Sequence, residues 1–183
     1  MKYDDIKTPK DLLEYMSKNI TYGFIGKSKK RYEGLKEGLD EYIVQSAEEV
    51  LESNIGTCWD QVELERDWFS NHNYIFKTLF LGFNVDYENT YPTHTFLLYE
   101  KDNKCYWFEN AWEDKRGIHE FNSFNDALNH VKDQHFLYAQ KRYNLDSKLK
   151  DNLECFDYDR PKPDLEAMDY VDHVTNGRKI KKI

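Results

Sequence analysis

The feature that most constrains the fold is a pair of strand-like segments on either side of a short polar turn. Residues 93–100 and 105–112 are rich in aromatic and β-branched side chains, and they flank the dipeptide Asp102-Asn103. Asp and Asn tolerate the positive φ angles that a two-residue hairpin turn needs. The two segments are therefore predicted to be antiparallel strands of one sheet.

The hairpin also predicts which side chains share a face. With a two-residue turn, Leu98 lies opposite Trp107 and, two residues further from the turn, Phe96 lies opposite Glu109. Successive side chains of a strand point to opposite faces. His94 therefore lies on the same face as Glu109, as its diagonal neighbour, within reach of a long side chain.

Helix signals dominate the chain before the hairpin. Ser, Thr and acidic residues at capping positions predict helix starts. The predicted helices run from Pro9 to about Asn19 after the cap Thr8, from Ser46 to a point before Gly56, and from Thr57 to about Phe69.

The remaining segments complete an α+β order of elements. Strands are predicted over residues 74–83 and 118–121, a polar loop over 84–92, and a helix from Ser123 to near His135. Helices followed by an antiparallel sheet and a further helix are typical of the α+β class. We expect one domain over residues 1–154 and a C-terminal tail over 155–183, with a short helix at residues 165–174.

Composition excludes several classes of protein. An aromatic content of 16% argues for a packed core. The net charge of −8 makes nucleic acid a poor partner, and the basic stretch at 178–182 is read as a solvated tail. No apolar run is long enough for a membrane span, and the charged N-terminus does not resemble a signal peptide. A cytoplasmic protein is expected.

Three cysteines, Cys58, Cys105 and Cys155, are too few and too scattered for a disulfide framework. No C-x-x-C pair is present for a structural zinc site. Cys105, beside the hairpin turn, is expected to be structural, and Cys155 falls in the expected tail without evident partners. Cys58 is therefore the candidate nucleophile.

Cys58 has the sequence surroundings that a thiol nucleophile requires. In the segment Gly56-Thr57-Cys58-Trp59-Asp60, Thr57 is the predicted N-cap and Cys58 the first helical residue. The unpaired N–H groups and dipole of a helix start stabilise a thiolate and the oxyanion of a tetrahedral intermediate. Gly56, Thr57 and Trp59 are candidates for lining the cleft.

His94 is the candidate base among six histidines, because it begins a strand that is paired in a hairpin. A rigid strand holds a catalytic group more accurately than a loop does. Its diagonal neighbour Glu109 would orient the imidazole and stabilise the imidazolium cation. A three-residue turn would place Asn110 opposite His94 instead, so Asn110 is the alternative orienting residue.

Residues 48–112 resemble the transglutaminase-like superfamily, a papain-like fold of thiol acyl-transfer enzymes and proteases. The resemblance rests on G-x-C opening a helix, followed by His94 on one strand and Glu109 on the returning strand. It implies an α+β, papain-like fold with N-terminal helices, in which the helix of the nucleophile Cys58 packs on an antiparallel sheet. The family usually has Asp where this chain has Glu109, and Asn serves this role in papain-type enzymes, which keeps Asn110 as the alternative.

The resemblance implies a thiol-dependent enzyme that acts on amide bonds of a peptide or protein, as a protease, a deamidase or a transglutaminase. Animal members of the family bind calcium, but residues 84–88 do not match a calcium loop, so neither a metal nor another cofactor is expected.

Two other classes of function stay open. The chain could be an inactive member of the fold that binds a peptide or protein in the same cleft. It could also be a metal-dependent hydrolase using Cys58, His72, His94 and Glu109, although these lack compact ligand spacing. Each residue also has a structural interpretation: an isolated cysteine is often a small buried hydrophobe, and a glutamate can guard a sheet edge.

Overall fold

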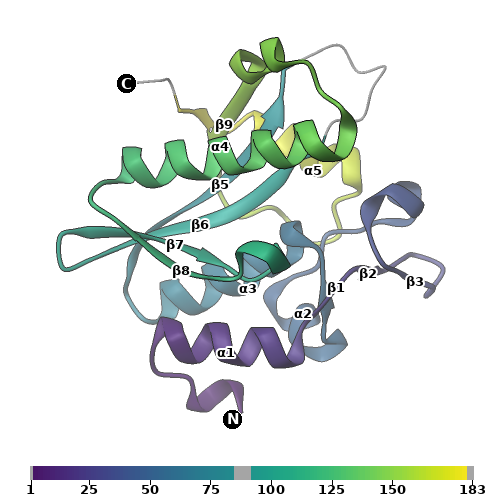
Figure 1. Cartoon of the computed structure of the whole chain (residues 1–183). Coiled ribbons are helices and arrows are strands. Elements are labelled where there is room, and N and C mark those ends of the chain that lie inside the picture. The colour runs from purple at the N-terminus through teal and green to yellow at the C-terminus, as the bar shows by residue number, and fades with distance from the viewer. Residues whose placement is uncertain (1, 85–91, 181–183) are drawn as a thin grey trace.

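A computed structural model describes residues 2–84 and 92–180 of the chain. The centre is a six-stranded antiparallel sheet with the strand order β10-β9-β5-β6-β7-β8 (Figure 1). Its strands are β5 (Ile75–Phe83), β6 (His94–Lys101), β7 (Lys104–Glu109), β8 (Gly117–Phe121), β9 (Leu153–Asp157) and β10 (Arg178–Lys179). The α+β class expected from the sequence is confirmed.

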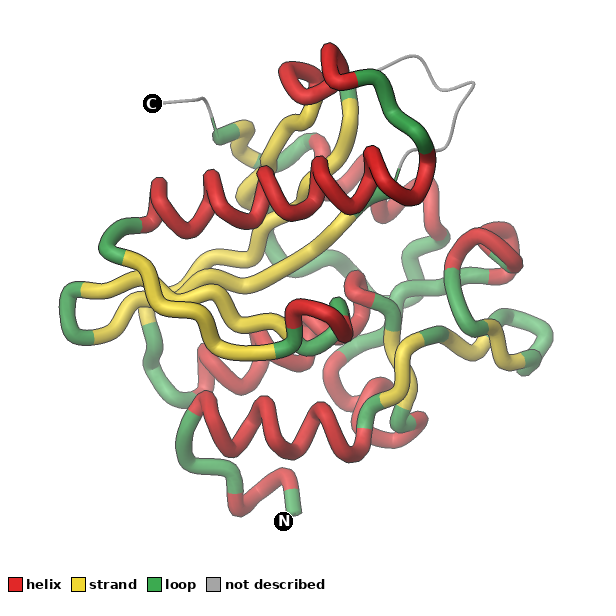
Figure 2. The backbone as a smooth tube through the Cα atoms, in the orientation of Figure 1, coloured by secondary structure: helices red, strands yellow, loops and turns green. Residues whose placement is uncertain are grey.

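Helices cover both faces of this sheet. They are α1 (Pro9–Asn19), α2 (Ala47–Ser53), α3 (Cys58–Asn71), α4 (Phe124–Tyr143) and α5 (Ala167–Thr175). Helix α4 lies across one face, and α1 and α3 lie against the other (Figures 1 and 2). Short strands outside the main sheet are β1 (Thr21–Tyr22), β2 (Phe24–Ile25), β3 (Arg31–Tyr32) and β4 (Ile55–Gly56).

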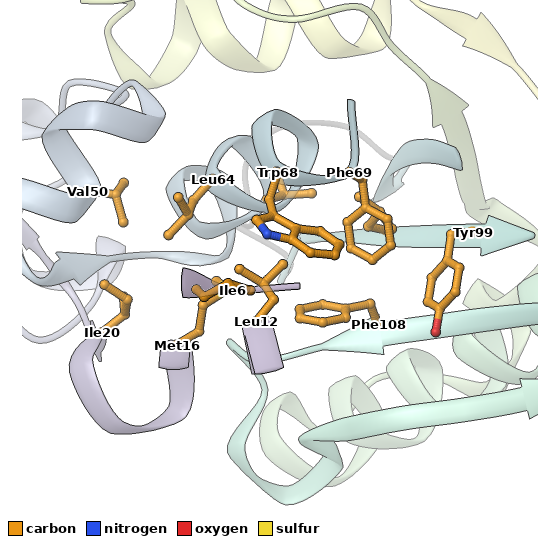
Figure 3. Packing of buried hydrophobic residues seen from close by; sticks show 12 residues of the cluster. Ile6, Leu12, Met16, Ile20, Val50, Leu64, Trp68, Phe69, Tyr99 and Phe108 are labelled. Atoms are coloured by element: carbon orange, nitrogen blue, oxygen red, sulfur yellow. The ribbon is translucent and has the colours of Figure 1, made fainter. Parts of the chain in front are cut away.

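Alternation along the strands separates two cores. Leu97 of β6 and Phe108 of β7 belong to a core cluster with residues of α1 and α3. Figure 3 shows Phe108 below Trp68 and Phe69 of α3. The neighbouring strand positions, such as Leu98, point to the opposite face and pack under α4. Both faces of the sheet are thus buried, which accounts for the near-continuous apolar character of β6.

The register of the predicted hairpin is confirmed. Lys101 pairs with Lys104, and Leu98 pairs with Trp107. Asp102 and Asn103 have φ angles of 51° and 60°, the left-handed conformation that a two-residue turn requires. The returning strand ends at Glu109, earlier than the predicted Trp112.

The predicted starts of α1, α2 and α3 are confirmed at the caps Thr8, Ser46 and Thr57. The predicted end of α4 near His135 is wrong, since the helix continues to Tyr143. It continues because its later turns still place Phe136 and Ala139 against the sheet, where both are buried. The predicted loop at 84–92 lies almost entirely outside the described residues.

The segment from residue 155 onward does not behave as a tail. Cys155 lies in the middle of β9 and pairs with Leu81 of β5, so the expected boundary between residues 154 and 155 falls inside a strand of the sheet. The expected short helix is α5, and its Tyr170 is buried against Trp59. Arg178 and Lys179, expected to be solvated, are exposed but pair with β9 as β10.

None of the helices in the described part of the chain has the length and apolar character needed to cross a bilayer.

Candidate active site

The candidate site lies where the start of α3 meets the start of β6 and the end of β7. Antiparallel pairing puts the beginning of β6 and the end of β7 at the same end of the sheet. Thr95 of β6 donates its hydroxyl hydrogen to the carbonyl oxygen of Cys58, which ties the strand to the helix start. Two segments that are far apart in sequence are thereby brought together.

A buried carboxylate fixes the first turn of α3. Asp60 accepts hydrogen bonds from the backbone N–H of Thr57 at 2.7 Å and from its hydroxyl at 2.8 Å. It also accepts from the Tyr42 hydroxyl at 2.6 Å and the Gln45 backbone N–H at 2.9 Å. Burial raises the pKa of Asp60 to about 6, against the effect of these donors.

Gly56 allows the chain to approach α3 closely. A Cβ atom at this position would lie 3.1 Å from Cβ of Asp60 and 3.3 Å from Cγ of Gln61. Gln61 in turn donates to the Gly56 carbonyl oxygen at 2.8 Å and accepts from Asn110 at 2.7 Å. Asn110 therefore holds the end of β7 to α3.

His94 and Glu109 form the contact that the hairpin register predicts. Nε2 of His94 donates to Oε2 of Glu109 at 2.8 Å, and both side chains are buried. The other carboxylate oxygen of Glu109 accepts the backbone N–H of Trp112 at 2.7 Å. With Asn110 committed to Gln61, Glu109 is the residue that orients the imidazole.

The thiol of Cys58 lies on the other side of the same imidazole. Its side chain forms a hydrogen bond with His94, and because Nε2 is occupied by Glu109, Nδ1 is the nitrogen that faces the sulfur. Burial alone would lower the pKa of His94, but the Glu109 charge and the Cys58 contact raise it to about 10. At neutral pH this histidine is a cation between a carboxylate and a thiol.

Two further buried groups next to this histidine were not predicted. His135 of α4 stacks on His94, with 6.0 Å between ring centroids and 17° between ring planes. Glu65 of α3 is buried, and its pKa is well above the ordinary range because of burial and the nearby Glu109 charge. Its spacing of seven residues from Cys58 is a two-turn helical repeat, and only that spacing could have indicated Glu65 from the sequence.

Three residues expected to line the cleft are instead packed into the interior. Gly56, Thr57 and Trp59 are all buried. The Trp59 ring stacks on Tyr170 at 4.6 Å, and its indole N–H donates to the hydroxyl of Thr93 at 3.3 Å. These residues support the site rather than form its surface.

The other cysteines lie in the core under α4. Burial raises the pKa of Cys105 to about 11 and that of Cys155 to about 12. Both therefore hold their protons at neutral pH. Burial thus makes both thiols poor nucleophiles, whereas Cys58 contacts the imidazole of His94, which leaves Cys58 as the candidate.

His72, the fourth group of the alternative zinc site, lies one residue beyond α3, at the opposite end from Cys58. Fourteen helical residues rise about 20 Å, too far for His72 and Cys58 to share a metal. Its Nδ1 donates to the carbonyl oxygen of Trp68. Over the described residues, no group of three or more His, Cys, Asp or Glu side chains is arranged to hold a metal ion.

Comparisons of the sequence with protein-family models and with curated proteins found no match to this chain.

Proposed function

We propose that this protein is a thiol-dependent enzyme that transfers or hydrolyses acyl groups at amide bonds of a peptide or protein substrate. The observation that carries the proposal is the buried row Cys58–His94–Glu109, in which one imidazole joins the thiol to the carboxylate. This arrangement has the parts of a nucleophile, a base and an orienting acid. The papain-like fold and the transglutaminase-like resemblance belong to the same proposal.

The proposed reaction begins from a thiolate and an imidazolium. The Cys58 sulfur attacks the amide carbonyl, and the backbone N–H groups at the start of α3 stabilise the oxyanion that forms. His94 gives its Nδ1 proton to the leaving amine, and the C–N bond breaks. Water or a second amine then attacks the thioester, with His94 as general base, and regenerates Cys58.

Glu109 keeps His94 protonated between turnovers. Its carboxylate faces Nε2 and accepts the N–H of Trp112 with its second oxygen, so its orientation is fixed from both sides. Such a partner maintains the tautomer and the direction of the catalytic imidazole. We place the reaction in the cytoplasm, because free thiols suit a reducing compartment.

One observation favours a second candidate, a peptide-binding module without catalysis. The Cys58 side chain is largely covered, with a relative exposure of 6%. If this cover does not open to a substrate carbonyl, the protein would bind a peptide at this site without attacking it.

Thiol alkylation separates these two candidates. The enzyme hypothesis predicts that iodoacetamide modifies Cys58 rapidly near neutral pH, and that His94→Ala slows this reaction by roughly tenfold or more, because the imidazolium no longer stabilises the thiolate. Replacement of the exposed His130 by alanine is the matched control and should leave the rate unchanged. Equal, slow modification of all three cysteines in the folded protein would support the binding module.

Acylation tests the chemistry itself. An activated ester such as p-nitrophenyl acetate should release a burst of one nitrophenol per protein and leave an acetyl group on Cys58, located by mass spectrometry of the peptides. Cys58→Ser should abolish this burst. A wild-type protein with no burst and no acetylated Cys58 would refute the proposed activity.

A further inference from the structure

Tyr22 is brought to the start of α3 by a short parallel strand pair. Strand β1 pairs with β4, and in this register Tyr22 lies opposite Gly56, two residues before Cys58. The next residue, Gly23, has a φ of 134°, and a Cβ there would lie 2.3 Å from the carbonyl oxygen of Tyr32. Glycine thus allows the chain to turn away directly after Tyr22, which leaves this side chain beside the thiol.

The hydroxyl of Tyr22 forms a hydrogen bond with the Cys58 side chain. The tyrosine as a whole is 45% exposed, whereas Cys58 is 6% exposed. The Tyr22 hydroxyl therefore contacts a largely covered thiol, while part of the tyrosine remains accessible to solvent. His94, which also contacts this thiol, is buried.

This hydroxyl stays a donor when the thiol ionises. The negative charge of Cys58, followed by burial of the hydroxyl, raises the pKa of Tyr22 well above its ordinary value. Tyr22 therefore keeps its proton beside the thiolate and points it at the sulfur. When the thiolate attacks a carbonyl, the negative charge moves from the sulfur to the carbonyl oxygen, and a donor held beside the sulfur is close to the atom where this charge develops.

We propose that Tyr22 is a catalytic residue whose hydroxyl donates to the oxyanion of the tetrahedral intermediate, as a side-chain partner of the Cys58 backbone N–H. The inference rests on the proposed function of the same site. Of the two groups that contact the sulfur, Tyr22 is partly exposed and His94 is buried, so we expect the carbonyl to approach on the Tyr22 side. In the tetrahedral intermediate the oxygen is two bonds from the sulfur, close to the hydroxyl that contacts this atom.

In the proposed step Tyr22 donates a hydrogen bond but transfers no proton. The Cys58 sulfur forms a bond to the carbonyl carbon, and the π electrons move onto the oxygen, which accepts a hydrogen bond from Tyr22 without taking its proton. Collapse of the intermediate restores the carbonyl and breaks the C–N bond, and the proton that the amine receives comes from His94. Tyr22 ends each half-reaction in the state in which it began.

The decisive variant is Tyr22→Phe, which removes the hydroxyl and keeps the ring. Two reactions of Cys58 are compared in it: acetylation by p-nitrophenyl acetate, which passes through an oxyanion, and alkylation by iodoacetamide, which does not. Both rates are taken on the plateau of their pH profiles, where the thiolate is fully formed. Tyr143→Phe, which removes the hydroxyl of another half-exposed tyrosine, is the matched control.

The proposal predicts that Tyr22→Phe slows acetylation by roughly 10²-fold while alkylation changes by less than about threefold. Tyr143→Phe should alter neither rate. Unchanged acetylation, or equal slowing of both reactions, would overturn the role of Tyr22 and leave the proposed activity standing. Faster reaction of both reagents would identify the hydroxyl as a cover over the thiol instead. Absence of acetylation in the wild-type protein would overturn both proposals.

Discussion

His94 and His135 are stacked histidines whose pKa values move in opposite directions. Their ring centroids are 6.0 Å apart, and both rings are buried. The pKa of His94 rises to about 10, since the Glu109 charge outweighs burial, and that of His135 falls to about 3, because burial and the His94 charge both oppose its protonation. The site thus holds one cationic and one neutral imidazole side by side at neutral pH.

Replacement of Glu109 by glutamine should remove the cause of the high His94 pKa. We expect the His94 pKa, followed by NMR of the imidazole protons, to fall by more than one unit in Glu109→Gln, and acylation of Cys58 to slow by roughly 10²-fold or more. Asn110→Ala is the control, because Asn110 bonds to Gln61 and not to His94. An unchanged His94 pKa in Glu109→Gln would contradict the assignment.

The same ion pair predicts a pH dependence of stability. The folded-state pKa of His94, about 10, lies above the ordinary value of 6.5. Its stabilising contribution is therefore complete below about pH 6.5 and is lost as the pH rises through 10. Urea unfolding at pH 6, 8 and 10 should show this loss in the wild-type protein and a flatter dependence in Glu109→Gln. Parallel curves for the two proteins would show that the pair does not contribute.

His135 should have the opposite effect in acid. The folded-state pKa of His135, about 3, lies below the ordinary value of 6.5. Between these two pH values the unfolded chain binds a proton at His135 and the folded chain does not. The unfolding free energy should fall as the pH decreases from 6.5 toward 3. His135→Phe keeps a ring against His94 but cannot be protonated, and it should lose less stability than the wild type over this range.

The matched control for His135 is the exposed His130, also on α4. The pKa of His130 is also lowered by burial, but without the large shift of His135, so His130→Phe should flatten the acid dependence less than His135→Phe does. Urea unfolding of the three proteins at pH 4 and pH 7 gives the comparison. If the unfolding free energy falls by the same amount between pH 7 and pH 4 in His135→Phe and in the wild type, His135 is not held neutral by the fold.

Asp60 should contribute more to stability than a surface carboxylate in the same helical position. Asp60→Ala removes the carboxylate that accepts four hydrogen bonds, so four donors around this buried position lose their acceptor. The variant should lower the unfolding free energy by roughly 3 kcal/mol. Asp126 is the third residue of α4 and accepts from the hydroxyl of the exposed Ser123. Asp126→Ala should cost about 1 kcal/mol or less. Equal costs in urea unfolding would contradict the role given to the Asp60 network.

Gly56→Ala tests the close packing at the start of α3. The added Cβ would lie 3.1 Å from Asp60 and should cost about 1–3 kcal/mol, since neither neighbour is free to move. It should also slow Cys58 alkylation by displacing the helix start. Gly34→Ala is the control, because a Cβ there has no neighbour within 4 Å among the described residues. A neutral Gly56→Ala would show that the first turn of α3 can relax.

Local signals in the sequence determined the helix starts, the hairpin register and the pairing of His94 with Glu109. Each depends on residues within about fifteen positions of one another: the caps of α1 and α3 act over three residues, and the turn at Asp102-Asn103 fixes every pair along β6 and β7. Such interactions need no knowledge of the rest of the fold, because strand alternation and cap geometry are properties of the local backbone.

Tertiary structure alone decided what surrounds those residues. Tyr22 reaches Cys58 through a two-residue strand, His135 reaches His94 from the middle of α4, and Tyr170 reaches Trp59 from a segment that was predicted to be a tail. None of these contacts has a sequence period or a local cap that indicates it. They form because the sheet and helices, packed to bury apolar surface, bring distant parts of the chain to one end of α3.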